Sequence, residues 1–425
     1  MKKMTITILG LGDRGLQVYG NIISQNTDTM ELVAVADCNL KRLALAQNKF
    51  ALPDSCCFPS EDALFAKERL SDIMFICTQD ADHVRHAILA IERGYHVLLE
   101  KPISANENEC RRLLETANKY NRKVCICHVL RYTPFYSTIK TIIDDGKIGR
   151  LMTIQAREDV GFFHMAHSYV RGNWRRSDET SPMIMAKCCH DLDLFVWLTG
   201  SSCTRLSSFG SLSWFKEENA PVSSGSRCML DCPNAVKAAC PYDCEKIYIT
   251  DPKSGIRYGN SWPSHILMAN PTEDGIREIL KTSPYGRCVY CCDNNVVDHQ
   301  QVNMLMGDEI LCSLSMTGFS NSVNRMIKVM GTMGEIEGDF NEEVIYLRRF
   351  GYPEQVIDLK KKYHDFEYHG GGDGRMVKQV MEYVMNDKKE FGITDLISSI
   401  ESHLMAIAAE ESRLNDGKVI EIKRG

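Results

Sequence analysis

Short apolar segments recur along the first 130 residues of the chain, and amphipathic stretches of helical period separate them. The segments cover residues 5–9, 31–37, 72–78, 95–102 and 123–129. Apolar runs of this length that alternate with helical patterns are typical of a parallel sheet with helices on its faces. We therefore predict an α/β domain with a doubly wound parallel sheet over residues 1–126.

The remainder of the chain shows a different pattern. Alternating apolar and polar residues over 298–320 predict a hairpin, and residues 327–340 and 342–350 continue as short strands with glycine turns. Strands joined in this way build an antiparallel sheet. Residues 393–418 have apolar positions at helical spacing and predict a closing helix whose Met and Leu side chains belong to the core. A second domain is thus expected over residues 127–425.

Composition and charge narrow the function classes. The chain has 425 residues, of which 44% are hydrophobic and 25% charged, as in an average soluble protein with two domains. With 50 basic and 56 acidic residues its net charge is −6, which does not favour a nucleic-acid or an anionic-membrane partner. No apolar stretch is long enough for a membrane span, and Asp13 and Arg14 interrupt the apolar start, so we expect a cytoplasmic protein with a small-molecule substrate.

A glycine-rich turn follows the first predicted strand and precedes a helix-compatible segment. In such a turn the first glycine permits the tight bend, the second lets a pyrophosphate approach, and the third lets the helix pack on the strand. Asp37 ends the second strand, where a carboxylate can bind the ribose hydroxyls and repels a 2′-phosphate. This favours NAD over NADP, although a plain surface turn also explains an aspartate there. The candidates of this region are Gly10, Gly12, Asp13, Arg14, Gly15 and Asp37.

Further cofactor candidates lie where later strands end. In an open parallel sheet, ligands bind beyond the carboxyl ends of the strands, so polar residues at those ends face one crevice. Lys101 should point at the nicotinamide end. The additional candidates are Thr78, His83, Glu100 and Lys101.

The motif Glu100-Lys101-Pro102 behind an N-terminal GxGxxG resembles the Gfo/Idh/MocA oxidoreductase family. The segments 78–83 (TQDADH), 131–136 (RYTPFY) and 187–200 (KCCHDLDLFVWLTG) support the resemblance, which extends over the whole chain. It implies a Rossmann domain followed by an α/β domain with a large, mostly antiparallel open sheet. That sheet would cover the nicotinamide and bind a sugar or polyol.

Oxidation of a secondary alcohol sends a hydride to the cofactor and a proton to a base. The resemblance assigns the lysine of the EKP motif, Lys101, a polarising and proton-relaying role. His190 is the second catalytic candidate because imidazole titrates near physiological pH. The family has an Asp four residues before this His; here that position is Ala186, and Lys187, three residues before His190, is the third candidate. Structural roles for Lys101 and His190 are the alternative.

Two polar stretches are candidates for lining the substrate site. Residues 167–176 combine hydrogen-bond donors with Trp174, and residues 369–375 are rich in glycine. An ordinary polar loop and a flexible turn explain these stretches equally well. The predicted substrate-binding residues are His128, Arg131, His167, Arg171, Trp174, Asp191 and His369.

A cysteine-rich insertion is expected at about residues 211–297. It carries seven of the 18 cysteines, and their paired spacings are close to those of zinc-thiolate sites. A structural zinc would hold together a segment that shows few apolar residues. An iron-sulfur cluster, disulfides and free thiols remain open. The nominal zinc ligands are Cys228, Cys232, Cys240 and Cys292.

The leading functional hypothesis is an NAD-dependent oxidoreductase acting on a secondary hydroxyl of a sugar, polyol or sugar derivative, with Lys101 and His190 handling the proton. An NAD-dependent glycosidase, which oxidises C3 transiently and eliminates the aglycone, is the alternative. A third hypothesis is a non-catalytic protein that senses a nucleotide. The presence of Lys101 and His190 argues against it. A homo-oligomer is plausible because exposed sheet faces often pair.

Overall fold

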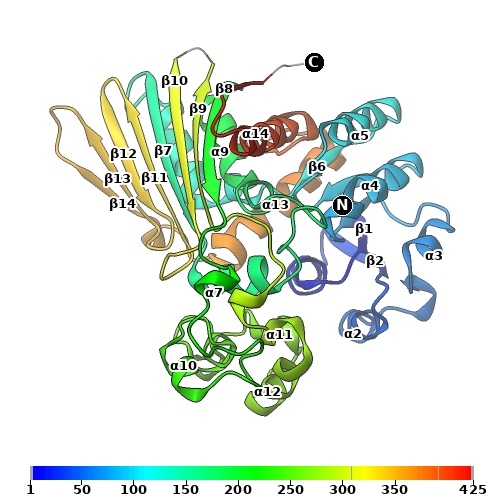
Figure 1. Ribbon diagram of the computed structural model, residues 1–425. Coiled ribbons are helices and arrows are strands. Elements are labelled where there is room, and N and C mark those ends of the chain that lie inside the picture. The colour runs from blue at the N-terminus through cyan, green and yellow to red at the C-terminus, as the bar shows by residue number, and fades with distance from the viewer. Residues whose placement is uncertain (1–2, 308, 391, 423–425) are drawn as a thin grey trace.

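The computed structural model describes residues 3–307, 309–390 and 392–422, and its chain forms two sheets with a helical lobe below them (Figure 1). The strands and helices predicted from the apolar pattern are present, and most shift by only one to three residues at their ends. The α/β fold class is therefore confirmed.

The N-terminal sheet is parallel and has the strand order β3-β2-β1-β4-β5-β6. The order reverses between β1 and β4, and a reversal of this kind leaves a crevice beyond the carboxyl ends of the strands. Helices lie between consecutive strands. The bounds are β1 Met4–Leu9, α1 Gly20–Gln25, β2 Met30–Ala36, α2 Leu40–Phe50, β3 Cys57–Phe58, α3 Glu61–Phe65, β4 Ile73–Ile76, α4 His83–Glu92, β5 His96–Leu99, α5 Glu107–Lys119 and β6 Val124–Ile126.

The second sheet has the order β14-β13-β12-β11-β7-β10-β9-β8-β15 and is antiparallel except where β7 pairs with β10. Burial alternates along its strands, so one face packs on helices and the other is open. The strands are β7 Leu151–Asp159, β8 Cys203–Ser211, β9 His299–Met306, β10 Ile310–Thr317, β11 Asn324–Gly331, β12 Gly334–Asp339, β13 Val344–Arg349, β14 Gln355–Asp358 and β15 Ile420–Glu421.

Helices of the second domain fill the space between the two sheets (Figure 1). The closing helix α14 packs on β8 and on α9, and α13 packs on the short helical turn Val129–Tyr132 that follows the first sheet. The site between the domains is thus enclosed by elements from both halves of the chain. These helices are α6 Pro134–Asp144, α7 Phe162–His164, α8 Met183–Ala186, α9 Cys189–Thr199, α13 Glu367–Asn386 and α14 Leu396–Leu414.

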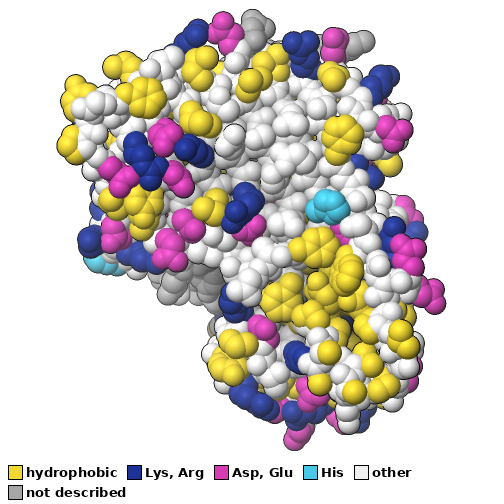
Figure 2. Space-filling view, turned by 60° about the vertical axis from the view of Figure 1, so that its left-hand side comes forward, with side chains coloured by type: hydrophobic (Ala, Val, Ile, Leu, Met, Phe, Trp, Pro, Cys, Tyr) yellow, Lys and Arg dark blue, Asp and Glu magenta, His cyan; other side chains and the backbone are white. Residues whose placement is uncertain are grey.

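The insertion connects β8 to β9 and forms a lobe of short helices, α10 Asn234–Ala239, α11 Ser264–Leu267 and α12 Glu273–Thr282 (Figure 1). Figure 2 shows this lobe set off from the body, with hydrophobic side chains gathered where the two meet. The expectation that the insertion cannot fold alone stays a prediction. Its buried side chains extend the main core and include Phe215, Tyr242, Ile247, Tyr248, Ile249, Ile276, Leu280, Val289 and Tyr290.

None of the helices in the described part of the chain has both the length and the apolar character needed to cross a membrane.

Candidate functional site

The glycine turn after β1 has the shape that a dinucleotide requires. Gly10 has φ = 93°, and a Cβ there would lie 2.5 Å from the carbonyl oxygen of Cys77; a Cβ on Gly15 would lie 2.0 Å from the carbonyl oxygen of Gly10. A Cβ on Gly12 would meet nothing within 4 Å. The first and third glycines are therefore required by close packing, whereas the second faces open space at the start of the helical segment Asp13–Tyr19, where a phosphate can bind.

Asp37 lies next to this turn and is only 8% exposed. Its carboxylate accepts hydrogen bonds from the backbone N–H groups of Leu11 at 2.6 Å and Asn39 at 2.7 Å. Two backbone donors therefore fix the carboxylate beside the glycine turn, and each oxygen keeps a further lone pair that can accept a hydrogen bond from a hydroxyl.

Arg14, predicted to bind the cofactor, forms a partly buried network with acidic residues. Its Nε donates to Oε1 of Glu100 at 2.6 Å and its Nη2 to Oδ1 of Asp373 at 2.5 Å, while Tyr19 donates to the same Glu100 oxygen at 2.7 Å. His369 contacts Asp373 through Nδ1 at 2.8 Å. The glycine-rich run 369–375 lies in the first turns of α13, and this network attaches that helix to the glycine turn of the first domain.

The remaining crevice residues of the first domain are engaged with neighbouring groups. The two ring nitrogens of His83 face the carbonyl oxygens of Pro102 at 2.6 Å and Thr78 at 3.1 Å, so His83 supports the turn that carries Lys101. The Thr78 hydroxyl lies 3.0 Å from Nδ1 of His86. Trp174 donates from its indole N–H to Asp80 at 3.2 Å, which ties the stretch 167–176 to the first domain.

Lys101 and His190 come from different domains, and the charge of Lys101 acts on the His190 ring. Lys101 follows β5, in which three of the four residues are buried, and its Nζ donates to the carbonyl oxygen of Ala186 at 2.9 Å, four residues before His190. The His190 ring lies 5.7 Å from the ring of His128, centroid to centroid. Within the described residues, Nδ1 of His190 and both nitrogens of His128 have no hydrogen-bond partner.

Both imidazoles are held in the neutral form. Burial, the Lys101 ammonium and His128 lower the pKa of His190 well below its usual value, and burial, Arg131 and Lys101 do the same for His128. Two neutral rings with unpaired nitrogens beside an ammonium group are suited to bind a hydroxyl and to accept its proton.

Lys187 lies between α8 and α9 and binds a buried carboxylate. Its Nζ is 3.2 Å from Oε1 of Glu158, which also binds Arg325 at 2.8 Å, and Arg325 reaches Asp191 at 2.9 Å. Burial lowers the pKa of Lys187, and Glu158 opposes this effect. Lys187 is therefore next to the crevice but shares its charge with Glu158, and Asp191 is held by Arg325.

Three other predicted substrate residues have partners within the second domain. Arg131 binds Asp193 through both Nε, at 2.6 Å, and Nη2. His167 contacts the Tyr248 hydroxyl at 2.8 Å, and Arg171 donates to the carbonyl oxygens of Arg287 and Tyr242, both at 2.7 Å. His167 and Arg171 thus attach the insertion to the rest of the second domain. Substrate contact by these three residues stays a prediction.

The nominal zinc ligands are only partly brought together. Cys228, Cys232 and Cys240 line one small cavity of the insertion, and Cys288 lines it as well. Cys292 is not among the lining residues; its thiol donates to the carbonyl oxygen of Cys288 at 3.2 Å. Asp243 and Cys244, which are not among the nominal ligands, lie with their ligand atoms within 4.8 Å of that of Cys228.

Known proteins match the chain in both halves. Residues 4–128 match the family described as "Oxidoreductase family, NAD-binding Rossmann fold", and residues 136–243 match the "GFO/IDH/MocA C-terminal domain". The chain belongs to the Gfo/Idh/MocA family. It is thus a member of an NAD-binding oxidoreductase family, as the EKP motif and the glycine turn predicted.

Among its relatives, YteT of Bacillus subtilis, named as an oxidoreductase, is 24% identical over 96% of this chain and 94% of its own. Inositol 2-dehydrogenase of Salmonella paratyphi B is 27% identical over 45% of this chain and 53% of its own. The structure of the WlbA dehydrogenase from Bordetella pertussis, in complex with NADH and UDP-GlcNAcA, has a TM-score of 0.67 at 16% identity and covers 100% of both chains, which shows the shared fold.

The sequence analysis missed residues that shape this Gfo/Idh/MocA site. Glu158 and Arg325 are paired across β7 and β11 and lie on the buried face, where an alternating strand pattern calls for apolar residues. Two charged residues at inward-facing strand positions were the sequence feature from which this buried ion pair could have been predicted. His265 of the insertion contacts Asp13 of the glycine turn at 2.8 Å, and no local pattern predicts that contact.

Proposed function

We propose that this chain is an NAD-dependent dehydrogenase that oxidises a secondary hydroxyl of a sugar, polyol or sugar derivative. The observation that carries the proposal is the convergence of the Lys101 ammonium with the neutral rings of His190 and His128 in the crevice between the domains. When bound, the nicotinamide supplies the hydride acceptor at its C4. The dehydrogenase name of the inositol-specific relative supports the choice of a polyol or sugar.

In this proposal, different residues of the chain have different roles in the oxidation of the alcohol. Lys101 already donates to the Ala186 carbonyl, and its other protons can hydrogen-bond the alcohol oxygen and stabilise negative charge on it. A neutral imidazole of His190 accepts the hydroxyl proton while the carbon loses its hydride, so the products are a ketone, a reduced cofactor and one proton. Lys187, whose charge acts on His164, would bind a neighbouring hydroxyl of the substrate.

Asp37 supports NAD rather than NADP as the cofactor. Its carboxylate is fixed by two backbone N–H groups, so it cannot easily turn away from a 2′-phosphate. Holding a phosphate dianion against a fixed carboxylate would cost electrostatic free energy. We expect Asp37→Ala to weaken NAD binding and to reduce the preference for NAD over NADP, as measured by titration with both cofactors.

The decisive experiment is a spectroscopic screen for NADH formation with inositols, other polyols, sugars and sugar acids, followed by substitution of Lys101. Lys101→Ala should lower kcat/KM by about 10²–10⁴-fold on the best substrate, because it removes the group that binds the reacting oxygen. The dissociation constant of NAD should change little. Lys119→Ala, at an exposed position on α5, is the matched control and should behave as wild type. Full turnover by Lys101→Ala would refute the mechanism.

The same screen distinguishes a redox-neutral glycosidase. If the NAD-loaded protein released the aglycone of a chromogenic glycoside without net NADH formation, and Lys101→Ala abolished this release, the hydride would be returning to the substrate in each cycle. That result would show that the site catalyses the glycosidase reaction instead of net oxidation.

A further inference from the structure

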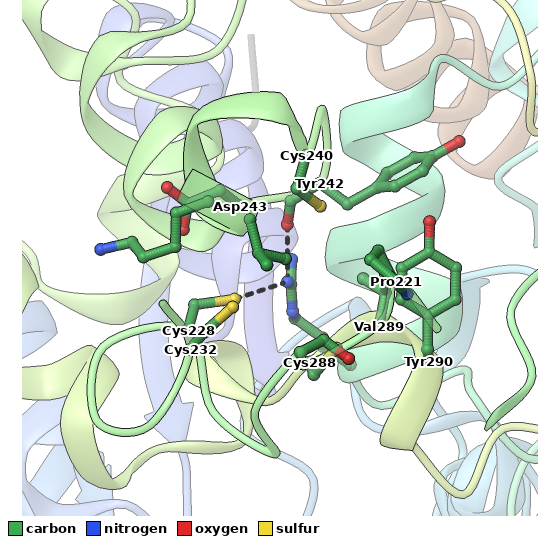
Figure 3. A pocket seen from close by; sticks show the side chains of 13 residues that line it. Pro221, Cys228, Cys232, Cys240, Tyr242, Asp243, Cys288, Val289 and Tyr290 are labelled. Atoms are coloured by element: carbon green, nitrogen blue, oxygen red, sulfur yellow. Dashed lines mark hydrogen bonds between the residues drawn. The ribbon is translucent and has the colours of Figure 1, made fainter. Parts of the chain in front are cut away.

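Four cysteines of the insertion line a cavity that is large enough for about one water molecule or ion. The cavity has a volume of about 10 Å³ and is lined by Cys228, Cys232, Cys240 and Cys288 together with Asp243 and Arg171 (Figure 3). A cavity of this size accommodates roughly one small atom or ion. Four thiols and a carboxylate around such a space are unusual surroundings for a water molecule.

Two of the lining residues, Cys228 and Asp243, have the separation of metal ligands together with Cys244, which is not among the lining residues. The sulfur atoms of Cys228 and Cys244 and a carboxylate oxygen of Asp243 all lie within 4.8 Å of one another, and all three residues are buried. With zinc–sulfur bonds of 2.3 Å, the sulfurs of a tetrahedral site are about 3.8 Å apart. Small side-chain movements are therefore sufficient to close the three groups on one ion, and Cys240 and Cys288 line the cavity beside Cys228 and Asp243.

The buried cation beside these thiols is an independent indication of negative charge. Arg171 is 1% exposed, and the dashed lines in Figure 3 mark its bonds to the Tyr242 carbonyl at 2.7 Å and to Sγ of Cys228 at 3.7 Å. Its Nη1 is buried and, among the described residues, without a hydrogen-bond partner. A buried guanidinium is costly unless an anion offsets its charge.

We propose that the insertion holds a structural zinc ion, bound by Cys228, Cys244 and Asp243, with Arg171 as the neighbouring cation. Each thiol loses its proton to solvent on binding. Two thiolates, one carboxylate and Zn²⁺ carry one net negative charge, which the guanidinium balances. Sulfur and carboxylate ligands at these distances suit zinc, and a hydrogen bond from an outer residue to a ligating sulfur is typical of such sites.

This proposed ligand set differs from the nominal one, Cys228, Cys232, Cys240 and Cys292, and shares only Cys228 with it. The spacing of residues along the chain cannot show that Asp243 and Cys244 turn toward Cys228, because the loop between them decides the direction of each side chain.

The zinc site has a consequence for the crevice. The ion joins residues 228 and 243–244 to the segment around Arg171, and the same lobe places Trp262 against His164 at 4.8 Å between ring centroids and His265 against Asp13. Loss of the ion should therefore loosen the lobe and weaken dinucleotide binding as a secondary effect, because Asp13 belongs to the glycine turn.

The test is metal analysis of the full chain, produced with zinc in the growth medium and purified without chelators. The wild type should contain about one zinc per chain, and the double variant Cys228→Ser, Cys244→Ser less than a tenth of that amount. Cys291→Ser, an exposed cysteine of the same insertion, is the matched control and should keep its zinc. A wild type with less than a tenth of an equivalent, or a double variant with wild-type zinc, would overturn the proposal.

A second measurement covers the case in which the double variant does not fold. Native mass spectrometry of the wild type should show the mass of one zinc ion minus two protons. A mercurial reagent that reacts with thiols should release this zinc to a colorimetric indicator. A mass lower by two hydrogens with no metal would reveal a disulfide in place of zinc, and bound iron would reveal a different metal; either result refutes the zinc site. These outcomes do not depend on the dehydrogenase activity.

Discussion

Two buried arginines in the second domain are stabilised in different ways. Arg325, beside the crevice, binds the carboxylates of Glu158 and Asp191, and Glu158 also binds Lys187. Arg171, at the base of the insertion, donates to two carbonyl oxygens and one thiol. Two arginines that are both buried thus have different electrostatic partners.

The difference shows how each region obtains its charge balance. The cluster at the crevice is complete within the protein, with two cationic and two anionic side chains, and it fixes the helix that carries His190. In the described part of the chain, the partners of the arginine at the insertion are two carbonyl oxygens and a thiol, and in our proposal the thiolates of a zinc site complete this cluster. Substitution of residues in the first cluster should therefore lower the stability of the protein. In the second cluster, metal removal should lower the stability as well.

The largest effect is expected when the crevice cluster is broken. Glu158→Gln leaves Lys187 and Arg325 with only Asp191, and loss of one partner from a buried ion network costs about 3–5 kcal/mol of unfolding free energy. Chemical denaturation measures this loss. Glu309→Gln is the control, because its ion pair with Arg150 is about two-thirds exposed and contributes about 0–1 kcal/mol. Equal losses in both variants would contradict the role of the buried network.

A smaller effect is expected at the second arginine. Arg171→Met removes donors from two buried carbonyls, which costs about 1–3 kcal/mol, but it leaves no carboxylate unpaired. In zinc-depleted protein the loss should be smaller than in zinc-loaded protein, since uncharged thiols need no neighbouring cation. Thermal unfolding of both forms checks the comparison, and a larger loss after depletion would speak against the zinc site.

The contact between insertion and glycine turn should contribute less still. The hydrogen bond to Asp13 raises the pKa of His265, so the charged pair stabilises the protein below pH 6.5 and this stabilisation is lost as the pH rises through the raised value. We expect His265→Gln to cost up to about 1 kcal/mol at pH 6, since the pair is partly exposed, and almost nothing at pH 9. His364→Gln, at an exposed position, is the control. If the difference in unfolding free energy between wild type and His265→Gln does not decrease from pH 6 to pH 9, the pairing is refuted.

The smallest effect concerns the pH profile of catalysis between pH 6 and 8. The pKa of His190 is well below 6.5 through burial and the Lys101 ammonium, so the imidazole stays neutral over this range. The acid limb of kcat/KM on the substrate found in the screen should therefore lie below pH 6. A limb with its midpoint near 6.5 that disappears in His190→Ala would show that this ring titrates normally.

Much of the fold follows from local patterns. Strands β1, β2, β4 and β5 are short buried runs, and their apolar residues and flanking turns were sufficient to predict both the elements and the parallel sheet. The glycine turn and the position of Lys101 followed in the same way, because residues at the ends of parallel strands face one crevice.

Other parts of the candidate site depend on contacts between distant segments. The pairing of Glu158 with Lys187 and Arg325 joins β7, the α8–α9 turn and β11, and the contact of Asp13 with His265 spans 252 residues. Spacing predicts which residues share a helix face or a strand end; it does not predict which loop folds back onto which. The same limit explains why Cys244 and Asp243 replace Cys292 beside Cys228.

By itself, the sequence determined the α/β class, the nucleotide turn and the presence of Lys101 and His190 at the ends of their elements, because these features arise from hydrogen bonding and burial within a few neighbouring residues. Only the tertiary structure decided which charges neutralise one another and which nitrogens and thiols stay without a partner. Those properties depend on distances between segments far apart in the chain, and an ionisable group responds to its surroundings in space.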